Sequence, residues 1–103
     1  MVKYMENSYF ATKVTFCQQF FDLAESLDVD YDELRELWLL DGRIGSSHTA
    51  VFREHRGYGG KCLPKDTKAI SAVARARGCT MSLLDAVEHY NKELRTKLGL
   101  PLK

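Results

Sequence analysis

The chain has 103 residues, of which 45% are hydrophobic, and its formal net charge is +1. This length suits one domain with a modest core, and the near-neutral charge excludes a global field that would attract nucleic acid or an acidic membrane surface. No apolar segment is long enough to span a bilayer or to serve as a signal. Three cysteines without framework spacing predict free thiols and a reducing compartment, the cytoplasm.

The first predicted element is one long helix over residues 2–27, because apolar side chains recur there at three- and four-residue steps. Its main apolar stripe consists of Met5, Tyr9, Phe16, Phe20, Leu23, Ala24 and Leu27. Further apolar residues widen this stripe, so we expect the helix to bury more than one face. Such a helix in so small a chain predicts contact with a partner chain or another domain.

A second helix is predicted to begin at Asp30, with Glu33 as its capping-box partner, and to end at Asp41 and Gly42. Residues 43–63 follow as a long loop that is rich in glycine, histidine and arginine and shows no clear period. Loops of this length are uncommon in compact domains and are often functional.

Two further helices are predicted, one from Pro64 or Lys65 to Arg77 and one from Ser82 to Lys97. Strand patterns are almost absent, so the predicted fold is all-α, with a long N-terminal helix packed with three shorter helices. The sequence has no dinucleotide-binding G-x-G-x-x-G fingerprint. A whole cofactor-dependent enzyme therefore does not fit in this chain.

The most informative segment is residues 57–66, Gly-Tyr-Gly-Gly-Lys-Cys-Leu-Pro-Lys-Asp. It places Cys62 between Lys61 and Lys65, next to the predicted start of a helix. Glycines allow the backbone to approach a ligand closely. The positive end of the helix dipole and the two lysines both favour the thiolate, which is a nucleophile.

The other cysteines and the histidines carry weaker signals. Cys17 and Cys79 lie in apolar helical or helix-flanking contexts and are predicted to be structural. His48, His55 and Cys62 lack the paired spacing of zinc ligands, so no metal site is predicted. A redox-sensing thiol built on Cys62 is a weaker alternative to a catalytic one.

Three motifs occur in an order that resembles the UDP-glucose/GDP-mannose dehydrogenase family. Residues 57–66 resemble its catalytic-cysteine motif, and residues 3–7 with 11–13 resemble the helix that carries its catalytic lysine and asparagine. Residues 41–45 resemble the turn before its active-site loop. The resemblance covers nearly the entire chain and implies that residues 1–103 are the central domain, which forms the dimer. The NAD-binding and UDP-binding domains that flank it in the family are absent from this sequence.

The resemblance also implies a reaction on a nucleotide sugar. Its C6 alcohol is oxidised to an aldehyde, and a thiolate captures this aldehyde. The adduct is oxidised to a thioester, which is hydrolysed to a uronic acid, and two NAD⁺ are consumed. Cys62 matches the nucleophile, and Lys3 and Asn7 match side chains that stabilise the oxygen on C6. Asp66 matches the carboxylate that positions water or takes a proton. Arg43 matches an arginine that reaches the sugar nucleotide of a neighbouring subunit.

The glycine-rich run adds candidate substrate-binding residues. Gly57, Tyr58, Gly59 and Gly60 match the part of the motif that contacts the substrate, and their backbone amides are expected to face it. UDP-glucose is the favoured substrate, because residues 43–45 and 64–66 resemble UDP-glucose members, and GDP-mannose is the alternative. Without an NAD site the isolated chain is predicted to be inactive. A homodimeric interaction module without chemistry is the competing interpretation.

Overall fold

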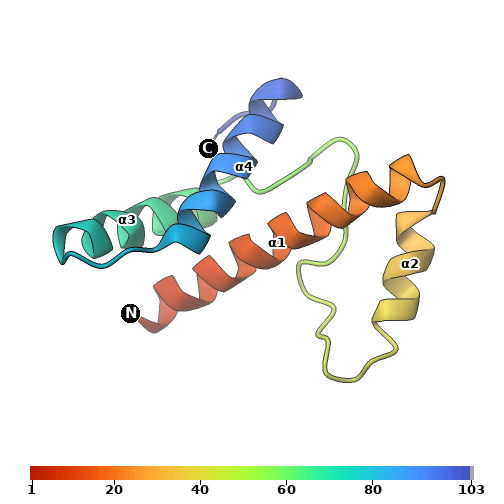
Figure 1. Ribbon diagram of the computed structural model, residues 1–103, viewed down its shortest axis with the longest axis horizontal. Coiled ribbons are helices and arrows are strands. Elements are labelled where there is room, and N and C mark those ends of the chain that lie inside the picture. The colour runs from red at the N-terminus through yellow and green to blue at the C-terminus, as the bar shows by residue number, and fades with distance from the viewer. Residues whose placement is uncertain (103) are drawn as a thin grey trace.

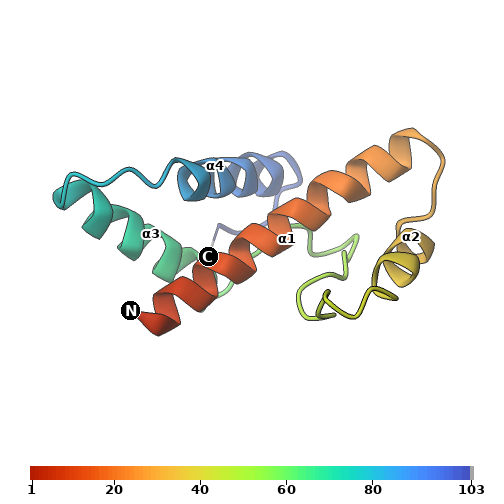
Figure 2. The ribbon, with the colours of Figure 1, turned by 60° about the horizontal axis from the view of Figure 1, so that its bottom comes forward.

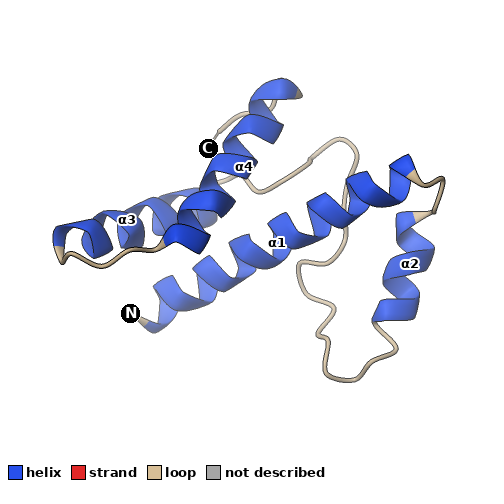
Figure 3. Cartoon of the chain, in the orientation of Figure 1, coloured by secondary structure: helices blue, strands red, loops and turns tan. Residues whose placement is uncertain are grey.

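The computed structural model describes residues 1–102 and contains four helices (Figure 1). Their bounds are α1 Val2–Ser26, α2 Tyr31–Trp38, α3 Cys62–Ala76 and α4 Ser82–Lys97. The described part of the chain contains no strand, so the prediction of an all-α fold is confirmed (Figure 3). None of its helices combines the length and the apolar character that crossing a membrane requires.

Helix α1 contacts each of the other three helices. Its N-terminal half packs against α3 and α4, and its C-terminal half packs against α2 (Figure 2). Each half has its own apolar cluster: the first consists of Ala11, Tyr58, Leu84 and Val87, and the second of Cys17, Phe21, Ala24 and Tyr31. Both clusters include residues of α1, so this helix is shared by the two halves.

The predicted apolar stripe of α1 faces solvent in the single chain. Its large members are roughly half exposed or more: Tyr9 60%, Phe16 49%, Phe20 44%, Leu23 51% and Leu27 63%. The buried face of α1 is carried instead by smaller residues and Phe21. Three short helices suffice to cover only one side of so long a helix, so its second apolar side remains open.

Helix α2 begins where the sequence predicts, but its cap differs in detail. The Asp30 carboxylate accepts a hydrogen bond of 3.1 Å from the N–H of Asp32. In the predicted capping box the Asp30 carboxylate would have accepted from the N–H of Glu33, one residue later. One of the free N–H groups of the first turn is satisfied either way.

Helix α2 ends at Trp38, three residues before the predicted Asp41, so that prediction is wrong. Beyond Trp38 the helix tightens, since the N–H groups of Leu40 and Asp41 bond to carbonyls three residues back instead of four. The Asp41 carboxylate accepts from the backbone N–H of Arg43 at 3.0 Å and so forms a turn of its own. Such an aspartate turn offers the backbone an alternative to the helix.

The two predicted structural cysteines differ. Cys17 is buried, as predicted, and burial is the main cause that raises the pKa of its thiol, with a hydrogen bond to Tyr31 acting in the opposite direction. Cys79 is exposed, so the prediction of a structural role is wrong. It follows Gly78, which has a φ of 73° and turns the chain away from the end of α3.

The connection from α2 to α3 has no helix or strand, as predicted, and runs back along α1 (Figure 1). Side chains fix it at several points. Tyr31 donates its hydroxyl to the carbonyl of Thr49 at 2.8 Å, and Arg35 donates to the Thr49 hydroxyl at 2.7 Å. Lys13 donates to the carbonyl of Gly45 at 2.8 Å. This connection thus delivers the glycine-rich run to a defined place beside α1.

Candidate functional site

Helix α3 begins on Cys62, two or three residues before the predicted start at Pro64 or Lys65. Pro64 therefore lies within the first turn, where its missing N–H costs nothing. Lys61 is the N-cap residue, and its side chain makes no capping hydrogen bond. Cys62 is exposed, so its thiol lies in solvent at the positive end of the helix dipole.

One hydrogen bond joins the start of α1 to the start of α3. The side-chain amide of Asn7 donates to Asp66 Oδ2 at 2.7 Å, across 59 positions of sequence. Asp66 lies one helical turn after Cys62 and is only 2% exposed. The amide has a second N–H and the carboxylate a second oxygen, so this pair has the capacity to bind a further polar group.

Lys3 lies one turn before Asn7 on the same face of α1 and is exposed. Figure 2 shows α1 and α3 diverging from starts that lie close together. Lys3 and Cys62 each precede one member of the Asn7–Asp66 pair by one helical turn, about 6 Å along the axis of their own helix. The starts of α1 and α3 thus carry the four predicted catalytic residues, Lys3, Asn7, Cys62 and Asp66, and we call this group the catalytic row.

The glycine-rich run is placed differently from the expectation. Tyr58 is buried, and its backbone N–H donates to Asn91 Oδ1 at 2.8 Å. The Asn91 amide returns a hydrogen bond of 2.9 Å to the carbonyl of Tyr58. The prediction of a ligand-facing amide is therefore wrong at Tyr58, because a side chain of α4 already occupies it. Burial is the main cause that raises the pKa of the Tyr58 hydroxyl to about 12.

The glycines on either side of Tyr58 are required by α4. A Cβ on Gly57, whose φ is 76°, would overlap Asn91 Oδ1. A Cβ on Gly59 would lie 2.6 Å from the guanidinium of Arg95. Gly60 has a φ of 85° and open space around it, so it serves the turn into α3.

Sequence reasoning missed Asn91 and Arg95. Both are buried polar residues on α4, at 6% exposure each. A signal was available, since they continue the spacing of the buried Leu84 and Val87 at steps of three and four residues. Polar residues on the inward face of a helix need partners, and here these partners are backbone groups.

Gly59→Ala is expected to lower the free energy of unfolding by about 2 kcal/mol, because the added methyl group displaces a guanidinium that is already held by hydrogen bonds. Gly42→Ala is the matched control, since a Cβ there meets nothing within 4 Å. Urea titration followed by circular dichroism measures both. The double variant Gly59→Ala with Arg95→Met should lose less unfolding free energy than the sum of the losses in the two single variants. Strict additivity, or a Gly59→Ala variant as stable as the control, would contradict this account.

Arg43 lies apart from the catalytic row. It is exposed and forms an ion pair of 2.7 Å with Asp41. This hydrogen bond lowers the pKa of Asp41 and raises that of Arg43. Arg43 lines a groove of about 240 Å³ with Thr12 and Trp38, and no residue of the catalytic row lines that groove. Within one chain the structure does not bring Arg43 to Cys62.

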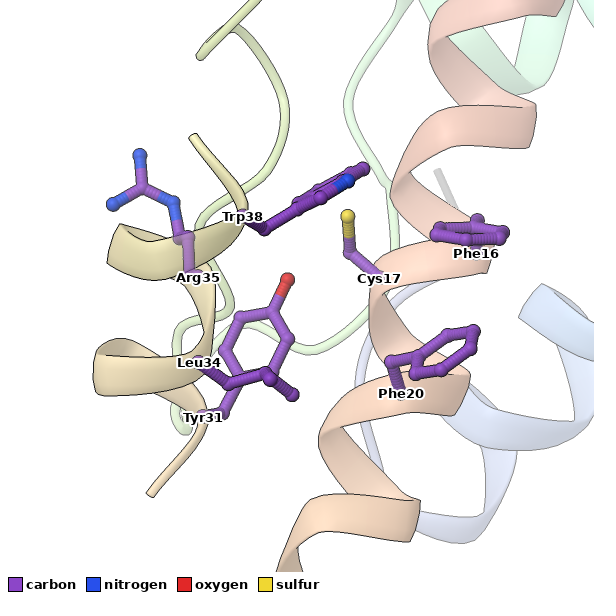
Figure 4. Close-up of a pocket in the computed structure, with 7 residues that line it drawn as sticks. All are labelled: Phe16, Cys17, Phe20, Tyr31, Leu34, Arg35 and Trp38. Atoms are coloured by element: carbon purple, nitrogen blue, oxygen red, sulfur yellow. The ribbon is translucent and has the colours of Figure 1, made fainter. Parts of the chain in front are cut away.

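A second, apolar groove of about 250 Å³ opens between α1 and α2 (Figure 4). Its lining consists of Phe16, Cys17, Phe20, Tyr31, Leu34, Arg35 and Trp38. The groove is carried by the C-terminal half of α1, whereas the catalytic row lies at its N-terminal end (Figure 1). Its position and its aromatic lining suit packing against another protein surface more than chemistry.

Comparison with known proteins gives a consistent result. Residues 1–93 match the family described as UDP-glucose/GDP-mannose dehydrogenase family, central domain. The chain is 40% identical over 91 residues to the UDP-glucose 6-dehydrogenase AglM of Haloferax volcanii, covering 88% of this chain. It is 32% identical over 98 residues to the UDP-glucose 6-dehydrogenase TuaD of Bacillus subtilis, covering 95% of this chain. A UDP-glucose 6-dehydrogenase of Rickettsia bellii is 36% identical over 93 residues, covering 90% of this chain.

The matched segment is a small part of each relative. The chain spans 20% of the length of the Haloferax protein and 21% of the length of each of the other two. These relatives thus contain most of their sequence outside the matched region.

Proposed function

The chain belongs to the UDP-glucose/GDP-mannose dehydrogenase family, and we propose that it is the central dimerisation and catalytic-cysteine domain of an NAD-dependent UDP-glucose 6-dehydrogenase. The observation that supports this most is the Asn7–Asp66 hydrogen bond, which joins α1 to α3 one turn from the exposed Cys62. Three free cysteines, two of them exposed, favour the reducing cytoplasm as its compartment.

The covalent step is assigned to Cys62. Its thiolate attacks the C6 aldehyde carbon of the nucleotide sugar, a carbon–sulfur bond forms, and the carbonyl oxygen becomes negatively charged. Lys3 and Asn7 stabilise this oxygen, since a cation and an amide N–H are both suited to a developing oxyanion. Their spacing of one helical turn lets both side chains face the same substrate atom.

The hydrolytic step is assigned to Asp66. As water attacks the thioester carbon, the Asp66 carboxylate accepts a proton from that water, the carbon–sulfur bond breaks, and the Cys62 thiolate is released. Asn7 holds one carboxylate oxygen of Asp66 at 2.7 Å, which fixes the orientation of the other. The product is the uronic acid.

The described residues do not fit an NAD site. They form no strand, and a dinucleotide is normally held at a turn between a strand and a helix. NAD supplies the acceptor for the hydride lost from C6, and we propose that a domain outside this chain holds it. The isolated chain is therefore expected to produce no NADH from UDP-glucose.

The dimer part of the proposal rests on the open side of α1. Its exposed apolar residues at positions 9, 16, 20, 23 and 27 follow steps of seven, four, three and four, which is the spacing of a helix–helix seam. The apolar groove between α1 and α2 borders this stripe through Phe16 and Phe20. Arg43 lines a groove together with Tyr9 and Phe16 of this stripe, so a second copy packed there would lie next to Arg43.

Light scattering after gel filtration measures the assembly directly. The chain is expected to be a dimer at tens of micromolar, and Phe16→Glu with Phe20→Glu should convert it to a monomer, because charges do not tolerate burial in an apolar seam. Glu6→Gln, an exposed change on α1, should leave the dimer intact. A wild-type monomer at that concentration would remove the dimer claim and, with it, the competing interpretation as an interaction module.

The enzymatic claim is tested by transplantation. The chain replaces the matched segment of the Bacillus subtilis relative, and NADH formation is measured with UDP-glucose and separately with GDP-mannose. We expect two NADH per UDP-glucose and none from GDP-mannose. A chimaera that melts cooperatively but forms no NADH from either substrate would refute the function, and preference for GDP-mannose would correct the substrate.

A further inference from the structure

The backbone just before Cys62 is held by α4 at three points. Asn91 pairs with both the N–H and the carbonyl of Tyr58, at 2.8 and 2.9 Å. Arg95 donates from Nη1 to the carbonyl of Arg56 at 2.9 Å. We call Asn91 and Arg95 the α4 clamp. Its members lie one helical turn apart, so both face the same stretch of backbone.

The Asn7–Asp66 hydrogen bond holds the second turn of α3, but little besides the clamp fixes the residues just before the helix. Lys61 makes no side-chain capping bond, and Gly60 has open space where its side chain would be. Only three residues separate Cys62 from the last clamped position, Tyr58. The place at which α3 begins, and with it the place of the thiol, therefore depends on the backbone that the clamp holds.

Arg95 has an unusual environment for a structural arginine. Its side chain is 6% exposed, and the described residues provide it with no carboxylate in an ion pair. Its hydrogen bonds run to the backbone carbonyls of Arg56 and Pro101. A buried cation is costly, and burial accordingly lowers the pKa of Arg95. Its close fit under Gly59 shows that this cation packs directly against the approach to Cys62.

We propose that Asn91 and Arg95 are positioning residues for Cys62, which act by locking residues 56–59 against α4 so that α3 begins on the cysteine. Neither residue touches the reacting atoms. The inference rests on the proposed function for its catalytic meaning, because it assumes that the Cys62 thiol is the reactive group. The hydrogen bonds of the clamp lie within this chain and do not depend on that assumption.

The test compares two exposed thiols in the same molecule. The folded 103-residue chain is alkylated with iodoacetamide at neutral pH, and peptide mass spectrometry gives the rates at Cys62 and Cys79. In Asn91→Leu the ratio of the Cys62 rate to the Cys79 rate should fall about threefold, because a frayed first turn gives up the helix-dipole contribution to the thiolate. Lys92→Ala, an exposed neighbour on α4, should leave the ratio unchanged.

Asn91→Asp keeps an acceptor for the N–H of Tyr58 and replaces the donor to its carbonyl by a carboxylate oxygen, whose charge lies one helical turn from the Arg95 guanidinium. It should therefore fold and show an intermediate ratio together with faster hydrogen exchange at residues 59–62. Both changes would support the clamp. An unchanged ratio and unchanged exchange in Asn91→Asp would overturn it, whether or not Asn91→Leu folds. Because alkylation needs neither NAD nor a nucleotide sugar, this result is independent of the transplantation outcome.

Discussion

Replacing Cys62 with alanine in the transplanted enzyme is expected to reduce NADH formation from UDP-glucose by at least about a thousandfold. The variant lacks the sulfur that captures the aldehyde, so the second oxidation has no covalent intermediate to act on. Cys62 is exposed in the first turn of α3, and its removal leaves no buried cavity. The loss should therefore appear in turnover and not in the melting temperature.

The chain supplies its own control for this experiment. Cys79 is also exposed but lies beyond the other end of α3. Cys79→Ala should keep the activity of the transplanted enzyme unchanged. Comparable losses in both variants would mean that the assay reports damage to the fold, and full activity in Cys62→Ala would refute the assigned nucleophile.

Asn7→Leu is expected to cost about 2 kcal/mol of unfolding free energy, because it leaves the buried Asp66 carboxylate without the amide that now binds it. For a domain of this size the melting temperature should fall by roughly 10 °C. Calorimetry of the isolated chain measures the loss. Glu6→Gln is the matched control, as an exposed change on the preceding position of α1. A melting temperature equal to the control would show that the pair contributes little.

Asp66→Asn separates the structural role of this pair from its chemical role. The new side chain still offers an oxygen to Asn7, so stability should change by no more than about 1 kcal/mol. It has no carboxylate to accept a proton, so hydrolysis in the transplanted enzyme should slow about a hundredfold. Equal losses of stability in Asn7→Leu and Asp66→Asn would contradict this division.

Much of the fold follows from local patterns in the sequence. The helical period of residues 2–27 locates α1 to within one residue at its C-terminal end, and the glycines at 78 and 99 mark where α3 and α4 stop. The end of α2 was missed because the chain changes to hydrogen bonds three residues back at Leu40 and Asp41, before the predicted stop at Asp41 and Gly42. Helical periodicity contains no information about such a change.

Which side of α1 is buried could not be predicted from its period. The stripe through Phe16 and Phe20 is the more apolar one, yet the chain buries the side with Ala11 and Cys17. Small residues let α3 and α4 approach α1 closely, whereas the larger side chains remain available to another surface. Periodicity shows which residues share a face, and the number of covering helices decides which face is closed.

Part of the candidate site could be predicted from local motifs, and the rest depends on contacts between residues far apart in the sequence. The cysteine loop and the pairs Lys3–Asn7 and Cys62–Asp66 follow from short motifs within single segments. The clamp formed by Asn91 and Arg95 depends on contacts across 33 and 39 positions, which no local pattern contains. Two of the glycines interpreted as making room for a ligand, Gly57 and Gly59, make room for these two side chains.

The central claim is that the Cys62 sulfur carries the substrate as a thioester, and mass spectrometry of the transplanted enzyme tests it most directly. The Asp66→Asn variant is supplied with UDP-glucose and NAD and quenched in acid, because slow hydrolysis should let the intermediate accumulate. We expect a UDP-linked uronyl group on the peptide that contains Cys62 and none on the peptide that contains Cys79. NADH formation with an unmodified Cys62 throughout the reaction, or with the adduct on another residue, would contradict it.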